Sequence, residues 1–104
     1  MQGEWIIYPE KIVAASAGAA IKLHFNAGKV YAVMGVEDHK VTVNARLNGE
    51  PLTNKKGNDV TNSEVDVTNN QLYFLVSLKQ AGEGTLELTA TRPGLELYTF
   101  TFGN

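Results

Sequence analysis

A period of two in hydropathy constrains the fold of this chain more than any other feature of its sequence. Ile21, Leu23 and Phe25 alternate with polar residues, and the same alternation returns over residues 41–47, 64–68 and 85–91. Successive side chains of a strand point to opposite faces of a sheet, so this period predicts strands that bury one face. The chain is therefore expected to consist mainly of strands.

No segment of the chain has a clear helical period. The alanine-rich residues 12–20 favour a helix intrinsically, but Gly18 interrupts them, and they are interpreted as a strand followed by a turn. Residues 29–37 and 72–78 are apolar on both faces instead of alternating. That pattern predicts central strands of the core.

Turn residues separate the expected strands. Asn48-Gly49 directly follows one strand, and this dipeptide tolerates the positive φ angles of a tight hairpin turn. Residues 81–84 and 92–94 mark two further breaks, while the polar residues 53–62 are expected to form the longest exposed loop. Near Leu97-Tyr98 the alternation changes phase by one residue, which predicts a β-bulge.

These elements predict an all-β fold, an antiparallel jelly-roll-like β-sandwich of about eight strands. The 104 residues contain no repeat, low-complexity tail or linker, so residues 1–104 are expected to form a single β-sandwich domain. A chain of this length buries roughly two-thirds of its unfolded surface, which is enough for a core without disulfides or metal.

Composition excludes several classes of function. With no cysteine, the chain has no thiol nucleophile, redox pair or thiolate metal site. A net charge of −2, with nine Lys and Arg against eleven Asp and Glu, gives no clustered excess of positive charge for nucleic acid. The apolar runs are far shorter than the ~20 residues of a membrane helix, so no membrane insertion is expected.

Exposed aromatic rings are the candidate ligand-binding groups, because sugar rings stack on aromatic faces. Trp5 and Tyr8 lie beside polar neighbours near the N-terminus, and Tyr31 lies in an apolar strand. The alternative is packing, with the ring buried and its polar atom hydrogen-bonded, and this reading is favoured for Trp5 and Tyr31. Tyr73 and Tyr98 are expected to pack first of all, and the alternative for Tyr98 is to tie down a loop through its hydroxyl.

Side-chain oxygens gather in and after the polar loop, and they are the ligands that calcium prefers. Asp59 and Asp66 are the candidate metal ligands. The spacing matches no fixed calcium loop, however, and Asn and Asp are also ordinary turn residues, so turn chemistry is the favoured reading. For Asp59 that reading predicts a side chain folded back to accept hydrogen bonds from loop amides.

Catalytic residue types fall into no recognisable arrangement. His24 and His39 lack a second metal ligand at a suitable spacing, and no serine has the context of a nucleophile elbow. The eleven carboxylates include no pair in an evident acid/base setting. The chain is expected to be non-enzymatic and to hold no cofactor.

The C-terminal half carries a family resemblance. Its motifs are Gly57-x-Asp59-Val60, Leu72-Tyr73-x-Leu75-Val76, Gly84-x-Leu86-x-Leu88 and the closing Tyr98-x-Phe100-Thr101-Phe102-Gly103. They resemble the C-terminal domain of DipZ-type thioredoxin-like proteins, which take part in cytochrome c biogenesis and thiol-disulfide exchange. Gly3-Glu4-Trp5 and the hairpin around Asn48-Gly49 agree more loosely, so the resemblance covers almost the whole chain.

The resemblance implies a β-sandwich similar to a carbohydrate-binding module that follows a redox-active thioredoxin-like domain in the same polypeptide. It implies an extracytoplasmic setting, periplasmic or in the cell envelope, with targeting sequence upstream of this chain. The expected function is that of a non-catalytic accessory domain that positions or extends the thioredoxin-like domain. The alternative is a carbohydrate-binding module that recognises an extracytoplasmic glycan through exposed aromatic residues.

Overall fold

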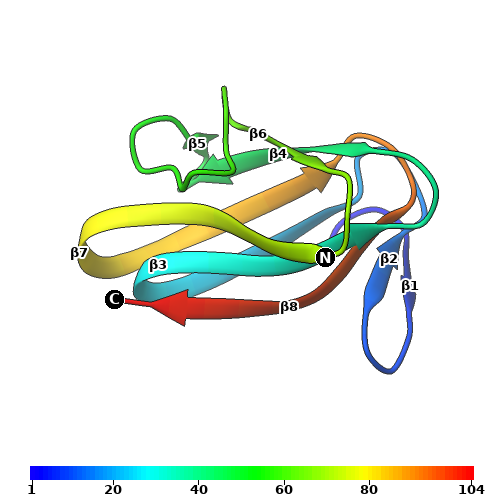
Figure 1. Ribbon diagram of the computed structural model, residues 1–104, viewed down its shortest axis with the longest axis horizontal. Helices are drawn as coiled ribbons and strands as arrows, with labels where there is room; N and C mark the ends of the chain where they lie inside the picture. The colour runs from blue at the N-terminus through cyan, green and yellow to red at the C-terminus, as the bar shows by residue number, and fades with distance from the viewer.

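Two long antiparallel strands, β3 (Ala20–Val36) and β7 (Gln71–Ala90), form the centre of the structure (Figure 1). The computed structural model describes all residues 1–104 and contains no helix. All strands belong to one antiparallel sheet in the order β1-β2-β8-β3-β7-β4-β5, and β6 also pairs with β4. The six shorter strands are β1 (Trp5–Ile7), β2 (Ile12–Ala14), β4 (Val41–Leu47), β5 (Glu50–Pro51), β6 (Glu64–Val67) and β8 (Leu95–Gly103).

The ladder between β3 and β7 bends where the two strands carry unequal numbers of residues. Ala27 pairs with Gly82, but Lys29 pairs with Ser77, so Gly28 alone faces residues 78–81 of β7. Gly28 also has no room for a side chain, because a Cβ there would lie 2.8 Å from the backbone carbon of Asn104. Extra residues on one strand make a ladder twist and bend.

The bend makes one sheet supply both layers of a sandwich. Layer I contains residues 29–36 of β3, residues 71–77 of β7, and strands β8, β2 and β1. Layer II contains residues 20–27 of β3, residues 82–90 of β7, and strands β4, β5 and β6. In Figure 1 layer I lies toward the viewer, and the β1–β2 hairpin projects from one end.

The core lies between the inner faces of the two layers. Period-two alternation placed the layer II residues correctly, since Val43 and Leu86 are fully buried. In layer I, Val30 and Met34 are fully buried on the inner face, but Tyr31 and Val33 on the other face are only half-buried, so this strand is not covered on both sides. The expected all-β antiparallel sandwich of eight strands is confirmed.

Two local expectations are also confirmed. Asn48 and Gly49, with φ angles of 54° and 84°, form the two-residue turn between β4 and β5. In β8, Val33 pairs with Thr99 and Met34 with Leu97, which leaves Tyr98 as the extra residue of the expected bulge.

The expected strand break at residues 81–84 is wrong, because β7 runs continuously through it, just as β3 runs through Gly28. Glycine and a change of phase mark a bend at these positions rather than an end. The backbone pairing resumes on the far side of the bend, where each strand has entered the other layer.

Layer I contains a matched pair of leucines for testing this account of the core. Leu75 is 0% exposed and Leu72 is 49% exposed, although both lie in the same part of β7. Leu75→Ala is expected to lower the free energy of unfolding by about 2–5 kcal/mol, because it leaves a cavity. Leu72→Ala is expected to change it by about 0.5 kcal/mol. Urea unfolding measures both, and equal losses would contradict this assignment of the core.

Candidate functional site

A hollow of about 320 Å³ lies between the β1–β2 hairpin and β8, and it contains one of the predicted ligand-binding residues. Tyr8 lies in its wall, 41% exposed. Ten residues line it, most of them apolar: Tyr8, Pro9, Glu10, Lys11, Ile12, Ile21, Leu97, Tyr98, Thr99 and Phe100. The hollow combines aromatic walls with polar groups, which is the composition of small-ligand sites.

An ion pair holds the hairpin against β8 at this hollow. Lys11 Nζ donates to Glu96 Oε2 at 2.6 Å, and the Glu96 side chain is 8% exposed. The Tyr98 hydroxyl donates to the other carboxylate oxygen at 3.2 Å. Lys11 Nζ also lies 5.6 Å from the ring centroid of Tyr8 and 5.8 Å from that of Tyr98, within the range of cation–π contacts.

Glu96 raises the pKa of Lys11. The main cause is the hydrogen bond to its carboxylate, and desolvation opposes it. The ammonium is therefore held in its charged form, and the buried carboxylate has a partner, as a buried charge requires. Since each charge of this pair is neutralised by the other, Glu10 is the one charged lining residue without an ion-pair partner.

Trp5 lies in β1, outside this hollow. Its ring is half-buried and packs against the core, and its Nε1 donates to the carbonyl oxygen of Gln2 at 2.9 Å. Its polar atom is thus occupied within the chain, and its role as a ligand platform stays a prediction.

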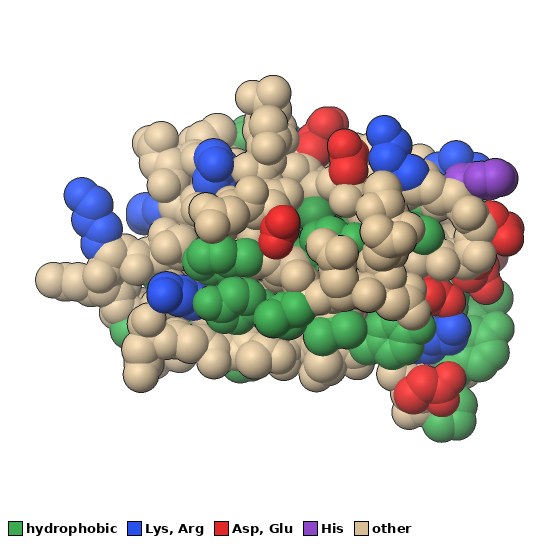
Figure 2. Space-filling model, in the orientation of Figure 1, with side chains coloured by type: hydrophobic (Ala, Val, Ile, Leu, Met, Phe, Trp, Pro, Cys, Tyr) green, Lys and Arg blue, Asp and Glu red, His purple; other side chains and the backbone are tan.

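Tyr31 lies on the outer face of layer I in an apolar band. Tyr31 pairs across the strands with Phe74, and the two rings stack with centroids 4.7 Å apart. Val33 pairs with Leu72 on the same face. We call these four residues, which are half-buried or exposed, the apolar band. Figure 2 shows hydrophobic side chains gathered across this face, over β7, β3 and β8.

The outer face of layer II is polar except at Ala20, which is buried at one end beside Gln2. Glu87 faces Lys22 on one side and Arg46 on the other, and the remaining positions are polar. They are His24, Asn26, Thr42, Asn44, Glu83, Thr85 and Thr89. One outer face of the sandwich therefore suits water, whereas the other carries partly exposed aromatic and aliphatic groups. Such a band is typical of an interaction surface.

Asp59 and Asp66 line one shared hollow of about 410 Å³ beside β6. Both carboxylates have partners within the chain. Asp59 Oδ2 accepts from the Phe74 amide at 2.7 Å, and Asp66 Oδ1 accepts from the Thr42 hydroxyl at 2.9 Å. The structure contains no group of three or more His, Asp or Glu side chains placed to hold a metal ion. The metal-binding role of the two residues stays a prediction.

Asp59 attaches the long loop to the edge of β7. The Asp59 side chain was expected to accept hydrogen bonds from amides of its own loop. That expectation is wrong, because the amide it accepts from is that of Phe74 in β7. Residues 55 and 57 add backbone hydrogen bonds to Ser77 and Leu75. Gly57 is required here, since a Cβ would overlap the Phe74 carbonyl. The loop thereby covers a strand edge that would otherwise be open.

Two tyrosines hold the turn between β6 and β7. The Tyr73 hydroxyl donates to the Asn69 carbonyl at 2.9 Å and accepts from the amides of Thr68 and Asn69. The Tyr98 hydroxyl accepts from the Asn70 side chain at 3.3 Å. Tyr98 thus makes the loop contact that was the alternative to packing, and Tyr73, which was expected to pack, makes the contacts to the turn backbone.

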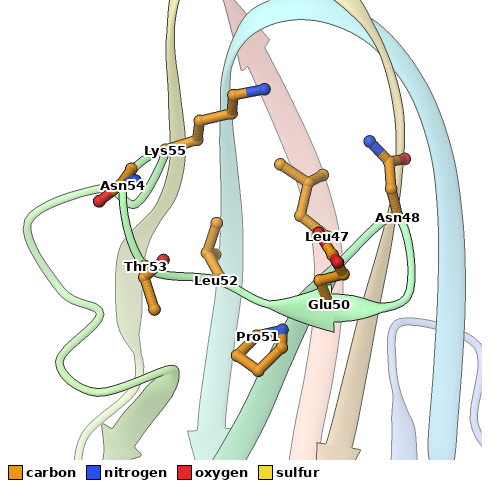
Figure 3. Close-up of a pocket in the computed structure, with 8 residues that line it drawn as sticks. All are labelled: Leu47, Asn48, Glu50, Pro51, Leu52, Thr53, Asn54 and Lys55. Carbon is orange, nitrogen blue, oxygen red and sulfur yellow. The ribbon is translucent and has the colours of Figure 1, made fainter.

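A third hollow lies at the β4–β5 hairpin. It measures about 190 Å³ and is lined mainly by polar residues between Leu47 and Lys55. Figure 3 shows these side chains spread around the turn and the following loop, without converging on one point. It offers no cluster of catalytic groups.

A hydroxyl, an imidazole and a carboxylate lie in series on layer II. His24 Nδ1 lies 3.2 Å from Thr85 Oγ1, and His24 Nε2 lies 3.3 Å from Glu83 Oε1. The His24 and Glu83 side chains are 68% and 70% exposed, and His24 and Thr85 line none of the hollows. The hydroxyl, imidazole and carboxylate follow one another as in a catalytic triad. A triad also needs a substrate bound against the hydroxyl and a nearby oxyanion site, and no hollow at His24 or Thr85 provides them.

Sequence reasoning missed Lys11 and Glu96, which form the polar centre of the Tyr8 hollow. They lie 85 residues apart, and nothing in the sequence pairs them. Glu96 does interrupt an apolar strand between Leu95 and Leu97, and that was the one available signal. The structure contains no helix with the length and hydropathy needed to span a membrane.

The Lys11–Glu96 pair is expected to make stability fall at alkaline pH. The folded-state pKa of Lys11 is raised, so its contribution is complete below the usual value of 10.5 and is lost as pH rises through the folded value. The Lys11→Met variant should lose less stability than wild type above pH 10.5. Lys22→Met, at an exposed residue of layer II, is the control and should follow wild type. Denaturant unfolding across pH measures all three.

The Asp59 contact is expected to stabilise the loop. Asp59→Ala removes the acceptor of the Phe74 amide and should lower the free energy of unfolding by about 1–2 kcal/mol. Hydrogen exchange in residues 55–59 should also become faster. Asp38→Ala, in the exposed turn before β4, is the control and should change neither. Unchanged exchange in Asp59→Ala would show that the loop is held without this contact.

Comparison with solved structures shows which fold this is. A family two carbohydrate esterase from Clostridium thermocellum, in complex with cellohexaose, superposes with a TM-score of 0.77 at 19% identity, over 97% of this chain and 30% of the esterase chain. A family two carbohydrate esterase from Cellvibrio japonicus superposes with a TM-score of 0.80 at 14% sequence identity. The match covers 98% of this chain and 30% of the esterase chain. At such identities the likeness shows the β-sandwich fold alone, and the chain spans less than a third of either esterase.

Comparison of the sequence with curated proteins gives no significant match. Comparison with protein families gives a match to the thioredoxin-like C-terminal domain family over residues 1–103. That match includes every strand and both sides of the Tyr8 hollow, and the chain therefore belongs to the thioredoxin-like C-terminal domain family.

Proposed function

We propose that this β-sandwich is a non-catalytic accessory domain that packs against the thioredoxin-like domain of its parent polypeptide and positions it. The family membership supports the presence of such a domain on the N-terminal side. The chain has no cysteine, so a thiol-disulfide step would belong to that neighbouring domain. By the family resemblance, the parent protein works in an extracytoplasmic compartment.

The apolar band is the observation that carries this proposal. Tyr31, Val33, Leu72 and Phe74 lie on the outer face of a sheet, whereas the exposed strand positions on the outer face of layer II are polar. Covering partly exposed aromatic and aliphatic groups with another protein surface stabilises an interface by the hydrophobic effect. His24 and Thr85 line no hollow that could hold a substrate against them, which supports a role without catalysis.

A second candidate is carbohydrate binding at the Tyr8 hollow. The exposed ring of Tyr8, the Tyr98 ring and the polar groups of Lys11 and Thr99 give it both stacking surfaces and hydrogen-bonding groups. A sandwich of this fold in a carbohydrate esterase crystallised with cellohexaose adds fold-level support, which does not by itself imply a function.

Titration calorimetry with the thioredoxin-like domain of the parent polypeptide tests the accessory role. Wild type should bind it, and Leu72→Lys should weaken binding about tenfold or more, because the interface would then bury a charge. Asn44→Lys is the matched control, since Asn44 is an exposed strand residue on the outer face of layer II. It should bind as wild type does.

Two outcomes would reject the accessory role as proposed. One is equal binding by wild type and Leu72→Lys. The other is no association with the thioredoxin-like domain, together with saturable binding of cellohexaose that changes Trp5 fluorescence and is lost in Tyr8→Ala. That second result would establish the carbohydrate-binding alternative.

A further inference from the structure

The bend of the sheet leaves several strand edges without a neighbour, and most of them are protected. β1 is three residues long and is followed by Pro9, and β5 is two residues long and contains Pro51. β6 is four residues long and carries Glu64 and Asp66. The edge of β7 in layer I is covered by the loop that Asp59 holds. Short length, proline, charge and coverage are the usual protections of an edge against pairing with another chain.

The C-terminal part of β8 has none of these protections. Residues 99–103 pair with β3 on one side, while β2 reaches only Glu96 and Leu97 on the other. No other backbone hydrogen bond involves residues 98–104. Residues 97–103 contain no charge and no proline, and residues 99–102 alternate threonine with phenylalanine. These residue types favour strands strongly.

The neighbouring free edge of β3 in layer II differs from that of β8. Residues 20–27 include the exposed Lys22 and His24, and a bridge from Gln2 to Ala20 covers one end. A lysine on an edge strand disfavours addition of another strand. β8 is therefore the one long, uncharged and uncovered edge of the sandwich.

We propose that the β8 edge pairs with β8 of a second copy of this chain, in an antiparallel arrangement about a two-fold axis at Thr101. This register uses the whole uncovered stretch, since Thr101 is the middle of residues 99–103. It pairs Thr101 with its own symmetry mate, Phe100 with Phe102 of the other copy, and Thr99 with Gly103. Layer I of each copy then continues into layer I of the other.

The composition of the edge selects a second copy as the partner. Two identical strands can pair only if no charge faces its own copy, because like charges opposite each other are destabilising. The uncharged β8 meets this condition. Each Phe102, 48% exposed in one copy, would lie opposite a Phe100, and such aromatic cross-strand pairs stabilise a sheet. A five-residue ladder is a small contact, so a reversible monomer–dimer equilibrium is expected.

Sedimentation velocity of the chain over a concentration series tests this pairing. Wild type should shift from monomer to dimer as concentration rises. Thr101→Lys should raise the dissociation constant about tenfold or more, because the two introduced lysines face each other. Thr89→Lys is the matched control, since Thr89 lies in a strand with neighbours on both sides, and it should dimerise as wild type does. Circular dichroism and thermal unfolding establish that both variants are folded.

Hydrogen exchange of wild type locates the contact without any substitution. Amides within residues 99–103 should become more protected at concentrations where the dimer forms. A chain that stays monomeric at all concentrations would overturn the proposal. So would a dimer that Thr101→Lys leaves intact, or one whose concentration-dependent protection lies in another segment. Each of these results is independent of whether the apolar band binds the thioredoxin-like domain.

Discussion

The ladder between β3 and β7 is the interaction on which the rest of the structure depends. It runs from Ala20 and Thr89 at one end to Met34 and Gln71 at the other, and it changes layer where Gly28 faces residues 78–81. Each half offers a free side to the strands of its own layer, β4 in layer II and β8 in layer I. The sandwich core closes because the two halves of one ladder lie face to face.

The same bend creates the surfaces that bear on function. Bending one sheet into two layers gives the sandwich two outer faces, of which layer II carries charged and hydroxyl groups and layer I carries the apolar band. It also leaves β8 with one unpaired side, because the β1–β2 hairpin covers only the start of that strand. A domain with one apolar outer face and one open edge is suited to contacts with other protein surfaces.

Side-chain hydrogen bonds hold the loops and the hairpin in place where backbone pairing between strands ends. Asp59 holds the long loop over the edge of β7, Tyr73 holds the turn before β7, and the Lys11–Glu96 pair holds the hairpin against β8. No buried side-chain nitrogen or oxygen lacks a hydrogen-bond partner. Functional residue types in this chain are thus largely engaged in holding segments together, as expected where polar groups leave water.

Local pattern alone determined the strand content, the hairpin at Asn48-Gly49, the bulge at Tyr98 and the identity of most core residues. Each follows from chemistry within a few neighbouring residues: side chains alternate along a strand, Asn and Gly accept positive φ, and a phase change requires an extra residue. Tertiary structure alone decided that β3 and β7 continue through their glycines. It also decided that Lys11 lies against Glu96. Tertiary structure likewise places Tyr31 in the apolar band, away from Trp5 and Tyr8, the other two candidate ligand-binding residues. Those relations join residues far apart in the chain, and the register of a bent ladder sets them.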